Sequence, residues 1–356
     1  MSDVPRPADA DPPANGAAAT AYAGWVSLLP RTAADPLATA FIAHLDVRGL
    51  SRNTLLAYGR ALESLIELVG PLDDLRLDAE CVHRFLSHLR QTPSRHRSAS
   101  GRRLSHATVR QRVVGLRAFA EYLVDCGRLD RNPVRRGSIR RTPEGDVIAV
   151  RRGLVPSASR VPRLPTDEQW SRLLNSLRAR PIRDRLMFTL AYDGALRRNE
   201  LVTLRLDDFD FPAQQVTIRA EHAKSGYPRT VVYSEPTSTL LRLYLPERRK
   251  LAPATPFLFL SGSPRNRSKP LGGFTWGLVA AALARDATVP GFSTHTLRHL
   301  RLTDLARAGL DITEIAKFAG HRSTESTMTY IHLSGRDLAR AFDRASRIMA
   351  ERLGRL

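Results

Sequence analysis

The chain has little cysteine, no long apolar run and fewer acidic than basic residues. Its 356 residues include only Cys81 and Cys126, too few for a disulfide scaffold or a cysteine-rich zinc site. Free thiols of this kind are ordinary in a reducing compartment. The longest run of small apolar residues, 277–284, is far shorter than the roughly 18–20 residues of a membrane span. The N-terminus lacks the basic and apolar regions of a secretory signal, so we expect a cytoplasmic protein.

The charge balance points to a polyanionic partner. Lysine and arginine number 55 against 35 acidic residues, a formal net charge of +20. Arginine carries nearly all of this excess. A GC-rich genome alone would produce the same bias toward arginine. Whatever its origin, such a charge attracts polyanions, which makes nucleic acid the partner class that the composition favours. The length suggests two domains, each able to bury a core.

The first third of the chain divides into a leader and a helical region. Residues 1–33 are dense in Pro, Ala and Asp without apolar periodicity, which predicts a disordered leader. Residues 34–135 follow helical spacing, with Ser51 and Ser105 placed as N-caps of two helices and Gly127 ending the second. We find no strand pattern here and expect a small all-helical domain.

A basic linker is predicted next, over residues 136–165. Eight arginines fall in or beside it, at positions 135, 136, 140, 141, 151, 152, 160 and 163. Such a charge run is usually a solvated segment. With this net charge, we favour a strap that follows a phosphate backbone while joining two domains.

A second domain is expected over residues 166–356. Thr166 and Gln169 have the spacing of a capping box, and a later helix stops at Gly194. Segments 214–220 and 229–234 are rich in β-branched residues and predict an antiparallel hairpin. Helical patterns follow at 274–283, 294–308, 312–318, 324–331 and 333–356. The predicted fold class is mainly α with a small antiparallel β-sheet (α+β).

Polar residues with complementary chemistry stand at helix starts and turns of this domain. In chain order they are Arg197, Lys224, His295, Arg298, His321 and Tyr330. Two arginines can clamp a phosphodiester and offset the charge of its transition state. A tyrosine can attack phosphorus if positive surroundings or a base assist it. A lysine can protonate the departing oxygen, and histidines can hold phosphate or move protons.

Each residue taken alone has a plainer explanation. Arg197 resembles a surface arginine at a helix start, Lys224 a solvated turn residue, and Tyr330 a core aromatic. His295 and His299 have the spacing of part of a zinc helix, but no glutamate follows His295 and no third ligand is near. We therefore expect neither a metal site nor a cofactor, and the ordered set of six favours a catalytic site.

These residues resemble the tyrosine recombinase, or phage integrase, family over about residues 35–356. Six positions match in order, and so do the motif words Gly-Ala-Leu-Arg-x-x-Glu-Leu, His-Thr-Leu-Arg-His, Ala-Gly-His and Thr-Met-Thr-Tyr-Ile-His. The resemblance implies a helical core-binding domain (34–135) and a catalytic domain (166–356) that close as a C-shaped clamp on double-stranded DNA. It also implies a homotetramer, or an assembly with a related recombinase, on a specific core site. Residues 333–356 would pass to a neighbouring protomer.

The resemblance assigns a role to each of the six residues. Tyr330 would attack the scissile phosphate to give a 3′-phosphotyrosine and a free 5′ hydroxyl, without metal or ATP. Arg197, Arg298 and His321 would hold the phosphate. Lys224 would be the general acid, and His295 an acid/base or phosphate ligand. His299 and His332 are typical of the family and are interpreted as supporting or structural residues.

Two alternatives and one register question remain open. A catalytically silent DNA-binding relative would use the same clamp as a regulator or architectural partner. A type IB topoisomerase would share the phosphotyrosine chemistry, although the helical N-terminal domain and the motif spacing favour a recombinase.

Arg198 follows Arg197 directly, so the register of the motif has to be chosen. Arg197 is chosen because it precedes Glu200 by three residues. The sequence does not distinguish mobile-element integration or transposition from dimer resolution.

Overall fold

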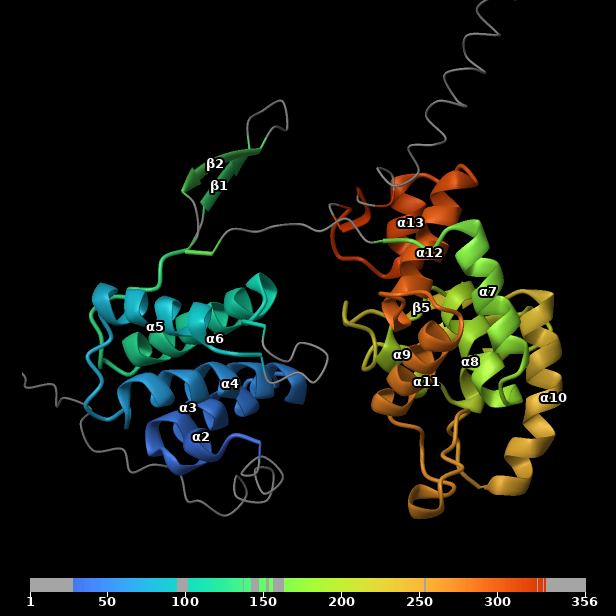
Figure 1. The fold of residues 1–356 in the computed structure, drawn as a ribbon, viewed down its shortest axis with the longest axis horizontal. Coiled ribbons are helices and arrows are strands. Elements are labelled where there is room, and N and C mark those ends of the chain that lie inside the picture. The colour runs from blue at the N-terminus through green and yellow to red at the C-terminus, as the bar shows by residue number, and fades with distance from the viewer. Residues whose placement is uncertain are drawn as a thin grey trace, which may run out of the picture. The chain divides into compact units, whose positions relative to one another are not determined.

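The structure is a computed structural model, and it divides the chain into two compact units, residues 1–159 and 160–356 (Figure 1). It describes residues 28–94, 102–136, 138–141, 147–151, 154–155, 163–252, 254–324, 326–328 and 330. The fold class is confirmed: helices dominate both units, and the second contains a small antiparallel sheet.

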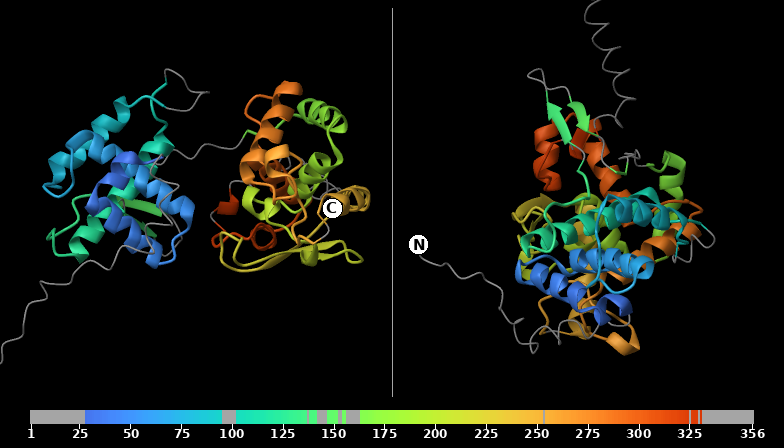
Figure 2. Two further views of the ribbon diagram at one scale, coloured as in Figure 1. Left: turned by 90° about the horizontal axis from the view of Figure 1, so that it is seen from below. Right: turned by 90° about the vertical axis from the view of Figure 1, so that its left-hand side faces the viewer.

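Unit 1 is built from helices and one hairpin. Their bounds are α2 (Pro30–Ala34), α3 (Pro36–Val47), α4 (Arg52–Val69), α5 (Ala79–Gln91), α6 (His106–Asp125), β1 (Ser138–Arg141) and β2 (Val147–Arg151). Helix α4 contacts α2, α3, α5 and α6 and so forms the centre of the bundle (Figure 1). Figure 2 gives two further views of the ribbon. Ser51 and Ser105 cap α4 and α6 as predicted, each side chain accepting a backbone N–H three residues on.

The last part of the predicted leader is folded, so the leader prediction was wrong from Leu28 onward. Pro30 begins the short helix α2, and the Leu29 side chain is 2% exposed in the core. Leu29 packs directly on Gly59, where an added Cβ would lie 2.5 Å from Leu29 Cδ1. Thr32 donates hydrogen bonds to Gly59 O and Glu63 Oε2. Tertiary packing stabilises this segment, which is why local periodicity did not reveal it.

Part of the predicted linker forms a two-stranded hairpin. Strands β1 and β2 pair antiparallel, with Arg141 opposite Val147 and Ser138 opposite Arg151. The sequence pattern predicted a linker and no strand in this stretch. Most of the segment between this hairpin and residue 163 lies outside the described residues, so the DNA-strap interpretation stays a prediction.

Unit 2 carries most of the helices. Its elements are α7 (Asp167–Arg178), α8 (Ile182–Asp193), α9 (Arg198–Val202), β3 (Phe209–Asp210), β4 (Gln215–Ile218), β5 (Arg229–Val232), α10 (Glu235–Leu251), α11 (Gly273–Asp286), α12 (Thr294–Arg307) and α13 (Ile312–Ala319). The backbone is again helical at 326–328 and at Tyr330. The capping box of Thr166 with Gln169 begins α7 as predicted, and α8 ends at Gly194.

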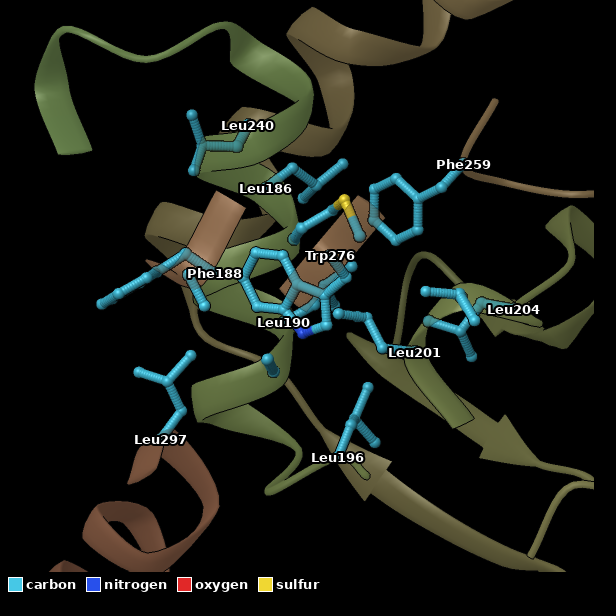
Figure 3. Packing of buried hydrophobic residues seen from close by; sticks show 14 of the residues in the cluster. Leu186, Phe188, Leu190, Leu196, Leu201, Leu204, Leu240, Phe259, Trp276 and Leu297 are labelled. Carbon is cyan, nitrogen blue, oxygen red and sulfur yellow. The ribbon is translucent and has the colours of Figure 1, made fainter. Parts of the chain in front are cut away.

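The core of unit 2 surrounds α8, which contacts α7, α9, α10 and α12. Leu186, Phe188 and Leu190 of α8 are fully buried, and the Trp276 indole of α11 lies among them (Figure 3). Leu297 of α12 joins the same cluster. This core therefore fixes the helix α12 that carries His295 and Arg298.

The predicted hairpin is confirmed, and a third strand extends it. Strands β4 and β5 pair antiparallel, and the short β3 adds to β4. Residues 219–228 form the turn between β4 and β5, and β5 contacts α13. Within the described part of the chain, no helix is long and apolar enough to cross a membrane.

Candidate active site

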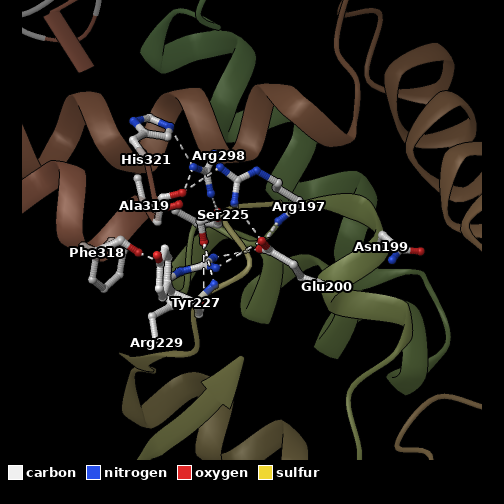
Figure 4. Close-up of polar contacts among 12 residues, drawn as sticks. Arg197, Asn199, Glu200, Ser225, Tyr227, Arg229, Arg298, Phe318, Ala319 and His321 are labelled. Carbon is white, nitrogen blue, oxygen red and sulfur yellow. Dashed lines mark hydrogen bonds and ion pairs between the residues drawn. The ribbon is translucent and has the colours of Figure 1, made fainter. Parts of the chain in front are cut away.

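Three guanidinium groups converge on the C-terminal end of α13. Arg229 Nε donates to Phe318 O at 3.0 Å, Arg298 Nη2 to Ala319 O at 2.6 Å, and Arg197 Nη2 to Gly320 O at 3.2 Å (Figure 4). The last carbonyls of a helix have no partner within it and carry the negative end of its dipole. The end of α13 therefore gathers three cations from distant parts of the chain.

Each arginine reaches this point from a different element. Arg197 is the N-cap residue of α9, Arg229 begins β5, and Arg298 lies in α12. Glu200 in α9 binds two of them: its carboxylate is 2.7 Å from Arg197 Nη1, and it accepts from Arg229 Nη1 and Nη2 at 3.0 and 2.7 Å. Arg298 also donates from Nη1 to Ala195 O at 2.5 Å.

The cluster carries more positive than negative charge. Burial opposes ionisation of Glu200, yet hydrogen bonds and charges from Arg229 and Arg197 outweigh it and hold its pKa at about 2. Arg298 is 4% exposed, and burial followed by the charge of Arg197 lowers its pKa to about 9. Three guanidiniums with one carboxylate leave a net positive charge, which suits an anionic ligand.

Backbone conformations at two turns hold this geometry. Gly320 ends α13 with φ of 64°, and a Cβ there would lie 3.1 Å from Arg229. The left-handed conformation favours glycine at this position, and a Cβ would press against the Arg229 side chain. Ala195 has φ of 46°, a conformation that costs energy for a residue with a Cβ. Its carbonyl is the one that Arg298 binds.

Tyr330 lies beside the cationic cluster. Its ring is 4% exposed and packs with Leu302, Ile315 and Ala319 in a small apolar group. The hydroxyl is 2.9 Å from His299 Nδ1. Burial raises the pKa of Tyr330, while the charges of Arg298 and Arg197 oppose the rise. The phenol is thus protonated at neutral pH and next to a possible proton acceptor.

His321 connects the arginines to the tyrosine. Its Nε2 is 2.8 Å from Arg298 Nη2, its Nδ1 is 2.9 Å from Thr327 Oγ1, and its ring stacks on Tyr330 with centroids 6.2 Å apart. Burial, then the charges of Arg298 and Arg197, lowers its pKa to about 4. The imidazole is therefore neutral at pH 7. Since arginine can only donate, Nε2 accepts and Nδ1–H donates to Thr327.

The remaining two predicted residues lie around this centre. The His295 ring is 6.5 Å from that of His299, one turn along α12. The pKa of His295 is lowered by desolvation and by nearby positive charges, among them Arg298 and Lys224. Lys224 is exposed in the β4–β5 turn. Arg298 thus contacts His321, which stacks on Tyr330, and Arg197 binds the Gly320 carbonyl next to His321. His295 and Lys224 lie at the margin.

Two residues of the network were not singled out as functional from the sequence. Arg229 binds Glu200 and α13, and His299, interpreted as supporting or structural, contacts the Tyr330 hydroxyl. The alternation of β5 gave a signal for Arg229, because it shares the inward face with buried Val231. Arg198, the alternative in the register question, is exposed.

The chemistry available here is that of an anion site beside a nucleophile. Among the residues that the structure describes, no group of three or more His, Cys, Asp or Glu side chains could hold a metal ion. Arginine and neutral histidine donors can bind phosphate oxygens, and a phenol adjacent to them can attack phosphorus.

Comparisons with known proteins identify the family. A model described as the phage integrase family matches residues 164–336. The tyrosine recombinase XerC of Roseiflexus castenholzii is 30% identical over 83% of this chain and 88% of that protein. The tyrosine recombinase XerA of Pyrococcus furiosus is also 30% identical, over 52% of this chain, and that match spans 63% of its length, less than two thirds.

Solved structures share the fold. The Tn1549 transposon integrase, solved in complex with transposon right end DNA, superposes with a TM-score of 0.63 at 16% identity, over 85% of this chain and 98% of that one. The match to XerC is the stronger finding, because it has 30% identity and spans 83% of this chain and 88% of that protein. The chain belongs to the tyrosine recombinase family, also called the phage integrase family, a family of site-specific recombination.

Proposed function

We propose that the chain is a site-specific DNA recombinase or integrase that cuts and rejoins DNA through a 3′-phosphotyrosine at Tyr330. The observation that supports this most directly is the convergence of Arg197, Arg298 and Arg229 on the end of α13. A net positive charge is thereby held beside a buried tyrosine whose hydroxyl contacts His299.

The proposed reaction exchanges one ester for another. Arg197, Arg298 and His321 hold the non-bridging oxygens of the scissile phosphate. For this His321 takes its other tautomer, in which Nε2–H donates to the phosphate and Nδ1 accepts from the Thr327 hydroxyl. The Tyr330 hydroxyl gives its proton to His299 Nδ1, 2.9 Å away, and its oxygen forms a bond to phosphorus while the bond from phosphorus to the 5′ oxygen breaks. Lys224 gives a proton to that oxygen, with His295 as a further acid/base or phosphate ligand. A 5′ hydroxyl of a partner duplex reverses the step, so the bond energy is retained without ATP.

The assembly is proposed to act on double-stranded DNA. The family resemblance suggests that units 1 and 2 close as a clamp around one core site and that four protomers form the synaptic complex. Residues 333–356, proposed as a helix exchanged between protomers, lie outside the described residues. The basic stretch 136–165 would add phosphate contacts.

The test uses nicked suicide duplexes tiled across the DNA that flanks the gene, where inverted repeats mark candidate core sites. Wild-type protein should form a covalent adduct that survives denaturing electrophoresis, and EDTA should not abolish it. Tyr330→Phe should bind the same duplex without forming the adduct. Binding without any wild-type adduct would instead indicate the silent DNA-binding relative, and an undiminished adduct from Tyr330→Phe would overturn the nucleophile assignment.

A further inference from the structure

Lys224, the proposed general acid, has to meet a strict geometric requirement. A general acid must come within hydrogen-bond reach of the oxygen that it protonates. Lys224 lies in the exposed turn of a hairpin, whereas Arg298 and Tyr330 are each 4% exposed in packed surroundings. The turn must therefore be held in place by another part of the chain if Lys224 is to stay within hydrogen-bond distance of that oxygen.

Arg322 supplies that connection. Its Nε and Nη2 both donate to the carbonyl of Ser225, the residue after Lys224, at 3.0 and 2.8 Å. Ser225 is 7% exposed and is one of the residues labelled in Figure 4. An added Cβ at Gly226 would lie 3.6 Å from Arg322 Nη2, so the guanidinium lies directly against the turn.

The other end of this connection is the segment that carries His321. Arg322 directly follows His321, whose Nε2 is 2.8 Å from Arg298 Nη2 and whose Nδ1 contacts buried Thr327. The hairpin turn is thus tied to the segment that carries His321. Charged donors on a carbonyl make stronger hydrogen bonds than neutral ones, and both of these converge on one oxygen.

We propose that Arg322 is a positioning residue that fastens the β4–β5 turn to the His321 segment and thereby keeps Lys224 beside the leaving oxygen. The inference rests on the proposed function. In the step concerned, the Tyr330 hydroxyl gives its proton to His299 Nδ1 and its oxygen bonds to phosphorus. The bond from phosphorus to the 5′ oxygen breaks, and a proton passes from Lys224 Nζ to that oxygen. Arg322 touches no reacting atom and acts only through the turn.

The test compares two nicked duplexes that carry a site cleaved by the wild type. One has the natural 5′ oxygen at the scissile phosphate, and the other has sulfur there, a leaving atom that departs without a proton. Arg322→Ala should slow adduct formation on the oxygen duplex by about 10- to 100-fold and restore it to near the wild-type rate on the sulfur duplex. Lys224→Ala should show the same pattern with a larger loss.

Arg322→Lys is the matched variant, because it keeps the charge but loses the two-donor geometry on the Ser225 carbonyl. It should show the same selective loss on the oxygen duplex, and it also serves if Arg322→Ala unfolds. Equal losses on both duplexes, or no loss on either, would overturn the positioning role. Absence of an adduct from the wild type, or its persistence in Tyr330→Phe, would instead overturn the proposed function.

Discussion

At the scale of single residues, Glu200 determines whether the arginine cluster can exist. Its side chain is fully buried and pairs with Arg197 and Arg229. Removing one partner of a buried ion pair leaves uncompensated charge, which typically costs about 3–5 kcal/mol. Glu200→Gln should therefore lower the free energy of unfolding by about that amount near neutral pH.

The same substitution should lose its effect in acid. Because the folded-state pKa of Glu200 is held at about 2, below its usual value of 4.5, its carboxylate stabilises the fold above pH 4.5, and that contribution disappears between about pH 4.5 and 2. Urea unfolding across this range measures it. Glu235→Gln, which breaks an exposed pair with Arg242, should cost under about 1 kcal/mol. A difference that is constant with pH would contradict the account.

His299 should matter for the nucleophile. Burial, then the charges of His295 and Arg298, lowers its pKa to about 4, so a neutral imidazole faces the Tyr330 hydroxyl across the neutral range. His299→Ala should slow adduct formation by roughly 100-fold at pH 7. His299→Gln can hold a hydrogen bond but cannot take a proton. Recovery of the full rate by the glutamine variant would reduce His299 to an orienting residue.

Sequence motifs predicted some residues of the candidate site and missed others. Motif words located Arg197, Arg298, His321 and Tyr330. In the structure Arg298 contacts His321, His321 stacks on Tyr330, and Arg197 binds Gly320 O beside them. Motifs did not give Arg229 a role, because its contacts with Glu200 and Phe318 depend on how β5 meets α9 and α13. These partners are 29 and 89 positions away in the sequence, so a local motif does not reveal them.

At the scale of elements, the short helix α2 should contribute to the stability of unit 1 through Leu29. This side chain is 2% exposed and packs directly against Gly59. Leu29→Ala should lower the free energy of unfolding of unit 1 by about 2–5 kcal/mol. Leu28→Ala, at a neighbouring leucine that is 54% exposed, should change it by less than about 0.5 kcal/mol. Equal effects in thermal unfolding would show that α2 is not part of the core.

Elements with a local signal were predicted, and those without one were not. Caps at Ser51, Ser105 and Thr166 were confirmed because side-chain capping is a short-range hydrogen bond. Helix α10 was missed; it contains Pro246, which removes a backbone donor and suggests an interruption, yet the helix continues to Leu251. Strand β3 has two residues and exists only because β4 pairs with it.

At the scale of the whole molecule, the net charge of +20 predicts binding that depends strongly on salt. If six to ten phosphates are contacted, affinity for duplex DNA should fall at least about 1,000-fold between roughly 50 and 200 mM salt. Replacing the exposed Arg135 and Arg136 by glutamine should lower the logarithmic slope by about two if both contact phosphates. A flat titration by fluorescence anisotropy would refute the proposed clamp.

The end of α13 contacts three arginines at once. Consecutive carbonyls of Phe318, Ala319 and Gly320 each accept from a different guanidinium, so fraying of this turn would remove one hydrogen bond from each of the three. Glu200 and the Ala195 carbonyl would still hold these side chains. Damage to this turn would therefore loosen all three cations together without dispersing them.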